Sequence, residues 1–243
     1  MKYISFIIPM RNDNYGGNLV DKLKYCHNHL ASNLEKFKIE SEIIYVDWNP
    51  PSHKQSLFAL IKKINKSKKI KVKVIKVNSS FHKKYKYSKS FPIMMEVADN
   101  VGFQRSEATF STNKAYDTYY SENFFYLLKN KKLDQNALTI ISRNLISFND
   151  LKKKRINKKI KYLQIRKGLL PYPVNAVGDG LIMSNKNRDI LKGFFEPNKS
   201  VGFGADRRLI YQASRRFKIL YIKNRVFLNK IISNRMYINT TTT

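Results

Sequence analysis

Two segments of the sequence carry acidic and polar residues at positions where they could bind a phosphorylated ligand. The strand-like run Glu42–Val46 leads straight into Asp47-Trp48-Asn49-Pro50-Pro51. Further along the chain, Asn100-Val101-Gly102 leads through Phe110-Ser111-Thr112-Asn113 to Asp117. A carboxylate at the end of a parallel strand can bind a ribose or a base edge, and a second can hold a divalent cation against a diphosphate. Together the segments favour an enzyme that acts on a nucleotide sugar.

Three further charged residues lie where they could take part in chemistry. Arg105 follows Asn100–Gly102, and its guanidinium could bind a phosphate through two hydrogen bonds. Asp179 lies between two glycines, which would let a ligand approach the backbone closely. Asp206 lies at the start of an amphipathic helical pattern, where a carboxylate could take the proton from an acceptor hydroxyl.

Each of these residues also has a plainer interpretation. Asp47 could form the turn before Asn-Pro-Pro, and Asn113 and Asp117 are of types common where a helix begins. Arg105 could be a solvated side chain at a helix end. Asp206 could cap its helix and interact favourably with the helix dipole. Residue types alone leave both interpretations open.

Several familiar motifs are absent from the sequence. The four histidines, His27, His29, His53 and His82, do not have the spacing of metal ligands, so no zinc site is expected. There is no Walker loop, no Gly-x-Ser-x-Gly elbow and no Gly-x-Gly-x-x-Gly fingerprint. The functional interpretation therefore depends on the segments described above.

The chain is strongly basic, with a formal net charge of +30. Such a charge can attract an anionic membrane surface, an anionic glycan or nucleic acid. The excess is mostly lysine, spread widely and accompanied by many Asn, Ile and Tyr, which is also the profile of an AT-rich genome. We rank a solvated surface first, a membrane surface or anionic glycan second, and nucleic acid last. The best local candidate for nucleic acid is His82–Tyr87, where lysines and tyrosines alternate.

Features of the sequence also predict a compartment. The single cysteine, Cys26, excludes an intramolecular disulfide and fits a reducing cytoplasm. No apolar run approaches the roughly 20 residues that cross a bilayer. Ile4–Ile8 is too short for a signal-peptide core. We expect a cytoplasmic protein whose basic face could hold it peripherally on the cytoplasmic side of the membrane.

The spacing of apolar residues predicts alternating strands and helices in the first half of the chain. Strands are expected at Tyr3–Pro9, Ile43–Val46, Ile70–Val74, Ala108–Thr112, Ala137–Ile141, Leu181–Met183 and Ile219–Ile222. Helices are expected at Leu19–Phe37, Leu57–Ile64, Pro92–Gln104, Glu122–Leu128 and Ala205–Ser214, and a loop at Phe81–Ser90. This order predicts an α/β fold with a mainly parallel central sheet and helices on both faces. The basic segment near 150–168 is expected to be an insertion or flap.

In this order the segments resemble the GT-A fold glycosyltransferases, especially the family 2-like group. The resemblance starts at Ile4–Asp13 and continues through Glu42–Pro51. It returns at Ala98–Arg105, at Ser111–Asn113 and at Asn175–Gly180. It implies a single GT-A (Rossmann-like) domain over residues 1–238, followed by a disordered tail at 239–243. The implied activity is transfer of a sugar from a nucleotide donor to a glycan or lipid-linked acceptor, with inversion, in cell-surface polysaccharide synthesis.

The resemblance also implies roles for individual residues. Pro9, Arg11 and Asp47 would line the nucleoside pocket, with Asn100 and Arg105 near the diphosphate. Asn113 and Asp117 would stand where the family places its Asp-x-Asp motif, with Asp117 holding Mn²⁺ or Mg²⁺. Asp179 would face the acceptor, and Asp206 would be the catalytic carboxylate.

Three departures from the family pattern keep two alternatives open. Four positions separate Asn113 from Asp117, Asp99 stands where relatives commonly carry a basic residue, and only Asn229 is near the place of a late histidine ligand. The first alternative is a catalytically degenerate transferase that acts as a scaffold. The second is a basic nucleic-acid-binding protein.

Overall fold

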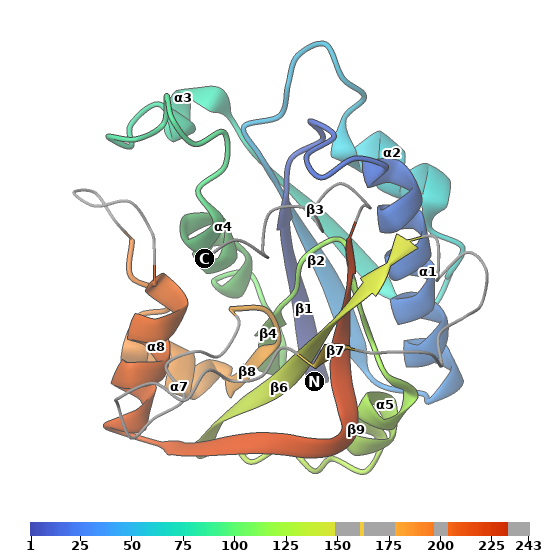
Figure 1. Cartoon of the computed structure of the whole chain (residues 1–243), viewed down its shortest axis with the longest axis vertical. Coiled ribbons are helices and arrows are strands. Elements are labelled where there is room, and N and C mark those ends of the chain that lie inside the picture. The colour runs from blue at the N-terminus through green and yellow to red at the C-terminus, as the bar shows by residue number, and fades with distance from the viewer. Residues whose placement is uncertain (149–160, 163–177, 197–203, 233–243) are drawn as a thin grey trace.

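The computed structural model describes residues 1–148, 161–162, 178–196 and 204–232, which Figure 1 shows in colour. Within this part of the chain a single sheet runs in the order β3-β2-β1-β4-β8-β6-β9-β5, with β7 beside β6. Its first half is wholly parallel and consists of β1 (Lys2–Met10), β2 (Ser41–Trp48), β3 (Lys71–Val77) and β4 (Ala108–Asn113). The carboxyl ends of these four strands therefore meet at one edge.

The second half of the sheet mixes directions. The short strand β8 (Leu181–Ser184) is antiparallel to both β4 and β6 (Ala137–Ser147). The long strand β9 (Lys218–Ile232) runs parallel to β6, while β5 (Thr118–Tyr120) and β7 (Lys161–Tyr162) pair antiparallel with β9 and β6. The expected α/β fold is confirmed, with antiparallel strands extending the parallel core.

Helices cover both faces of the sheet (Figure 1). One face carries α1 (Leu19–Lys36), α2 (Leu57–Ile64) and α5 (Glu122–Lys129), packed on a core that includes Leu23, Phe6 and Phe124. The other carries α4 (Met95–Phe103), α7 (Asn185–Leu191) and α8 (Ala205–Ser214), packed around Ile7 and Trp48. A single turn, α3 (Ser79–His82), follows β3. No described helix is both long and apolar enough to span a bilayer.

Tertiary contacts move several predicted boundaries. Pro9 does not end its strand: it is aligned with Val46, beyond the last β1–β4 pair at Ile7, where the missing N–H is tolerated because β1 has a neighbour on one side only. β6 and β9 run well past their predicted ends because they pair with each other along their length. Helix α4 begins at Met95 rather than Pro92, since Met94 has a non-helical backbone.

Three short elements were not predicted. α3 lies partly in the predicted loop Phe81–Ser90, and β5 is a strand only because β9 lies beside it. α7 lacks an apolar stripe in sequence and is started by Ser184, whose side chain accepts the backbone N–H of Asn187. The predicted insertion at 150–168 lies outside the described residues except for β7, and so does the predicted tail at 239–243.

Candidate active site

Asp47 lies just before the end of β2, beside Met10 of β1. Its side chain is buried, and Oδ2 accepts a hydrogen bond from the backbone N–H of Leu57, the first residue of α2, at 3.3 Å. Oδ1 has no hydrogen-bond partner among the described residues. Burial raises the pKa of Asp47, and the Leu57 N–H and the charges of Lys76 and Arg11 oppose that rise. One carboxylate oxygen is thus left for a ligand hydroxyl.

Arg11 connects the loop after β1 to the turn after β2. Its Nε donates to the carbonyl oxygen of Asn49 at 2.6 Å, and its guanidinium pairs with Asp13 at 3.0 Å. Asn49 is in the left-handed region (φ 48°) and donates from Nδ2 to the carbonyl oxygen of Pro92 at 3.1 Å. Pro9 lies two residues before Arg11 in β1. The structure therefore brings Pro9, Arg11 and Asp47 together at the ends of two neighbouring strands.

Asn113, the last residue of β4, holds the glycine loop that precedes β8. Its amide nitrogen donates to the carbonyl oxygen of Gly178, and its Oδ1 accepts the backbone N–H of Leu181 at 3.3 Å. The backbone N–H of Gly180 donates to the Asn113 carbonyl oxygen at 2.9 Å. β1 separates β4 from β2, and Asn113 is level with Ile44, three residues before Asp47. Strand spacing and rise along the strand together place Asn113 about 14 Å from Asp47. That distance leaves room for an extended ligand across the strand ends.

The loop held by Asn113 lies against Asp206. A Cβ added to Gly178 would be 3.2 Å from the Cβ of Asp206 and 3.3 Å from its Oδ2, so only a glycine allows this approach without displacement. Asp206 lies in the first turn of α8, is partly exposed, and accepts the backbone N–H of Arg207 through Oδ1 at 2.8 Å. Asp179 pairs with Arg143 of β6 at 2.9 Å. Asn113, Asp179 and Asp206 thus form one group.

Asn100 and Arg105 have hydrogen-bond partners other than the residues of this group. Both ends of the Asn100 amide are bonded to the segment after α7: Oδ1 accepts the Phe194 N–H at 2.8 Å, and Nδ2 donates to the Phe194 carbonyl oxygen at 2.8 Å. Arg105 lies just before β4 begins, at the amino edge of the sheet, where its carbonyl oxygen accepts from Lys73. The structure does not bring Arg105 to the carboxyl ends of the strands.

Asp117 lies in the short connection between β4 and β5 and is 7% exposed. Its backbone carbonyl oxygen accepts the N–H of Ile231 in β9 at 2.9 Å. Its charge counteracts the burial that lowers the pKa of Lys114, so the two side chains share one region.

Two charged groups of this region were missed from the sequence. Lys114 follows β4 directly and is 2% exposed. Asp99, on α4, is buried, and burial raises its pKa well above the usual range; the Arg188 charge opposes this rise, and the Asp179 and Glu96 charges add to it. The Arg188 guanidinium lies over the Phe103 ring at 3.4 Å and donates to the Ser111 carbonyl oxygen at 3.1 Å. Asp99 was noted in the sequence only as a departure from the family pattern, and no local signal marked Lys114.

The residues after β4 do not fit the divalent cation that a GT-A fold implies. Such a cation needs oxygen ligands, usually carboxylates. The amide of Asn113 is already bonded at both ends, Lys114 places a buried amine next in the chain, and Ala115 offers no side-chain ligand. Asp117, which was expected to hold the cation, is the only carboxylate of the segment 113–117. Across the described part of the chain, no group of three or more His, Cys, Asp or Glu side chains could hold a metal ion.

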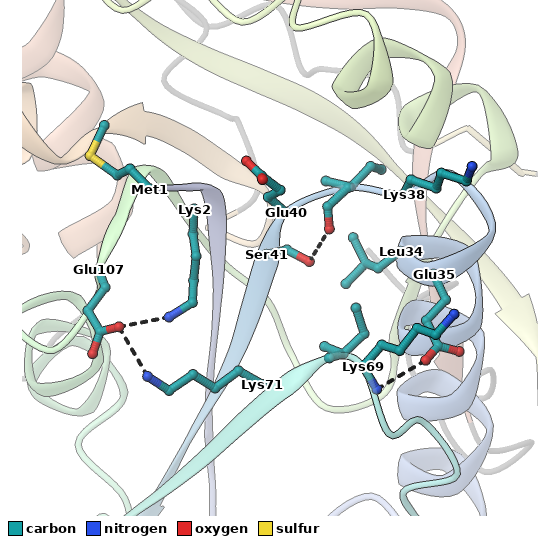
Figure 2. A pocket seen from close by; sticks show the side chains of 12 residues that line it. Met1, Lys2, Leu34, Glu35, Lys38, Glu40, Ser41, Lys69, Lys71 and Glu107 are labelled. Carbon is teal, nitrogen blue, oxygen red and sulfur yellow. Dashed lines mark hydrogen bonds and ion pairs between the residues drawn. The ribbon is translucent and has the colours of Figure 1, made fainter.

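A separate pocket lies at the opposite edge of the sheet (Figure 2). It is lined by residues at the amino ends of β1, β2 and β3 and the end of α1, among them Lys2, Lys38, Lys71 and Glu107. Lys2 and Lys71 both bond to Glu107 there. Ligands of open α/β sheets bind at the carboxyl ends of strands, so this pocket is not the candidate active site.

The sequence matches no family model and no curated protein. The structure is similar to that of residues 1–349 of S. aureus TarS, a GT-A glycosyltransferase. For the TarS complex with UDP-GlcNAc, the TM-score is 0.63 and the sequence identity is 15%, and the match covers 95% of this chain and 58% of that one. In complex with UDP, the TM-score is 0.59 and the identity 15%, over 96% and 61%.

A second similarity is to the catalytic domain of Drosophila beta1,4galactosyltransferase 7 in complex with xylobiose. The TM-score is 0.51 and the identity 12%, over 92% of this chain and 66% of that one. The chain therefore has a GT-A glycosyltransferase fold, as its resemblance implied. It spans about three fifths of the TarS fragment that it matches.

Proposed function

We propose that the protein transfers a sugar from a nucleotide-sugar donor to a hydroxyl group of a glycan or lipid-linked acceptor. The observation that carries the proposal is the position of Asp206. Its partly exposed carboxylate lies in the first turn of α8 against Gly178, in a loop that Asn113 fixes to the end of β4. A carboxylate that could act as the base is thereby held at the strand ends where a GT-A fold binds its donor.

The nucleoside would bind at the ends of β1 and β2. The Oδ1 atom of Asp47 can accept a hydrogen bond from a ribose hydroxyl or a base N–H. Arg11 keeps the backbone around this pocket in place through Asn49, and Pro9 lies in the strand beneath. The diphosphate would extend towards Asn113, which lies about 14 Å from Asp47 by strand spacing and rise.

The transfer would proceed by direct displacement with inversion. Asp206 accepts the acceptor O–H proton while the acceptor oxygen attacks the anomeric carbon. The bond between that carbon and the phosphate oxygen breaks, and the nucleoside diphosphate leaves with the electron pair. Asp179, oriented by Arg143, would face the acceptor. No step is assigned to a divalent cation, because the segment 113–117 supplies only the carboxylate of Asp117.

Three observations bear on the choice of substrates. TarS is described with UDP and UDP-GlcNAc, so uridine donors are the first to test. The galactosyltransferase domain is described with xylobiose, a glycan. The net charge of +30 would favour an anionic glycan, or a lipid-linked acceptor in an anionic membrane surface. We propose cell-surface polysaccharide synthesis as the setting.

A thermal-shift screen of UDP, GDP, CDP and their sugars tests the proposal. We expect one nucleotide class to raise the melting temperature by mass action, and its sugar to be hydrolysed slowly or transferred. Random-sequence DNA at low salt serves as the comparison. A shift with DNA and with none of the nucleotides would contradict the proposal and favour a nucleic-acid-binding protein. Nucleotide binding without any turnover would favour a scaffold.

A further inference from the structure

We infer that the buried ammonium group of Lys114 neutralises the donor diphosphate in place of a divalent cation, an inference that rests on the proposed function. Three observations support it: the place of Lys114 in the sheet, the state of its side chain and the chemistry of its neighbours.

Lys114 is fixed at the strand ends where the diphosphate would lie. Its backbone N–H donates to the carbonyl oxygen of Ile7 in β1 at 2.9 Å, immediately after β4 ends at Asn113. It therefore occupies the middle position of the Asn113–Ala115 triplet. An uninterrupted Asp-x-Asp motif would place a carboxylate at the third position, where Ala115 has a methyl group. Asp117, the residue expected to hold the cation, comes two positions later.

The side chain of Lys114 is buried and forms no ion pair with a described carboxylate. It is 2% exposed, and its Nζ donates to the carbonyl oxygen of Ala115 at 2.9 Å. An ammonium has three donors, and among the described residues no carboxylate lies within 4.0 Å of this one. A buried charge without a close counter-ion is costly, so such a lysine is poised for an anionic ligand.

A second lysine lies close by under the loop after β1. Lys22 of α1 is buried, and its Nζ donates to the carbonyl oxygen of Gly16 at 2.9 Å. Tyr116 donates from its hydroxyl to the carbonyl oxygen of Tyr15 at 2.6 Å and so ties the same loop to the segment after Lys114. A Cβ added to Gly16 would lie 3.5 Å from the Tyr116 hydroxyl and 3.9 Å from the Lys22 Nζ, so Lys22 lies beside the segment that follows Lys114. Two positive charges near a diphosphate would also repel a divalent cation.

Calorimetric titration with UDP, GDP and CDP tests the inference, each in a chelator and in manganese. We expect the same affinity for the binding nucleotide in both solutions. Lys114→Met should weaken its binding by about tenfold or more, because one charge-assisted contact is lost. The corresponding nucleoside, which lacks phosphates, should bind both proteins equally. Lys24→Met, an exposed lysine on α1, removes the same charge elsewhere and should have little effect.

Each outcome decides the question. Binding that needs manganese would overturn the inference while leaving the proposed function intact. Cation-independent binding that Lys114→Met does not weaken would overturn the role of Lys114. Equal loss of nucleoside binding in Lys114→Met would point to a disturbed fold, and circular dichroism with a melting curve would confirm it and overturn the inference. Binding of no nucleotide under either condition would remove the proposed function and the inference with it.

Discussion

Charged side chains have different surroundings at the two edges of the parallel sheet. At the amino edge, Glu42 accepts hydrogen bonds from Ser5 at 2.6 Å and from the Glu107 backbone at 2.7 Å. It also pairs with Lys2 and Lys73, each at 3.1 Å. Glu42, Lys2 and Lys73 each have a partner of opposite sign, so this cluster needs no ligand.

The carboxyl edge leaves its charges unbalanced. Asp47 and Asp99 each have a buried carboxylate oxygen without a hydrogen-bond partner among the described residues. Lys114 has a buried amine that forms no ion pair with a described carboxylate. Unsatisfied buried groups reduce stability and are concentrated at functional sites. The comparison indicates that the amino edge stabilises the fold, and it supports the proposal that the carboxyl edge binds the substrate.

The sharpest test of this division is Asp206→Asn at the carboxyl edge. The amide cannot accept the acceptor proton, so we expect transfer to fall by about 10²–10⁴-fold while nucleotide affinity and melting temperature stay the same. Initial-rate kinetics and a melting curve measure both. Asp21→Asn is the matched control, since Asp21 is also an acidic residue in the first turn of a helix. Equal rates for Asp206→Asn and the native protein would remove Asp206 from the mechanism.

At the amino edge, Glu42→Gln should show the reverse pattern. The amide keeps the shape but leaves Lys2 and Lys73 without their shared buried counter-ion, so stability should fall by about 2 kcal/mol. Nucleotide affinity should not change. Chemical denaturation and the calorimetric titration measure these two effects. A loss of affinity larger than the loss of stability explains would break the division between the edges.

Local sequence predicted the elements but not the contacts between distant segments. The bounds of α8 followed from apolar spacing alone, which is why Asp206 was assigned to a first turn. Arg105 was expected near the diphosphate because it follows Asn100, but α4 runs back towards the amino edge and carries Arg105 with it. The hydrogen bond between Asn113 and Gly178 joins residues far apart in sequence, and no local sequence pattern predicts it. The roles assigned to the site residues remain predictions.

The two edges should also respond to pH with opposite signs. Burial alone would raise the pKa of Glu42, but hydrogen bonds from Glu107, Ser5, Lys2 and Lys73 lower it overall. Its stabilising contribution is therefore present above its unfolded pKa of about 4.3 and is lost as the pH falls through the lower, folded value. In Glu42→Gln, that part of the acid-induced loss of stability should disappear. If the difference in stability between Glu42→Gln and the native protein stayed the same down to acidic pH, this prediction would be wrong.

Asp99 provides the opposite case. Its pKa is raised in the folded protein, so folding is favoured while the carboxyl group is protonated, and this contribution is lost as the pH rises from the unfolded value of about 3.9 towards the folded one. Asp99→Asn imitates the protonated form. We expect it to raise stability at neutral pH by about 1 kcal/mol, and by less near pH 4, as measured by denaturation at both pH values. An equal gain at both would show that ionisation of Asp99 is not the cause.

Lys114→Met should have the smallest effect on stability. Whether stability rises or falls in this variant distinguishes a functional lysine from a structural one. Large polar residues in a core usually cannot be replaced without loss, because their partners are left unpaired. Lys114 has only a backbone carbonyl as a close partner within the described chain, and methionine has a similar length. Stability should therefore be unchanged or rise by up to about 1 kcal/mol while nucleotide affinity falls. A clear loss of stability on denaturation would mean that Lys114 acts through Asp117 to support the fold, and the carboxyl edge would then resemble the amino edge.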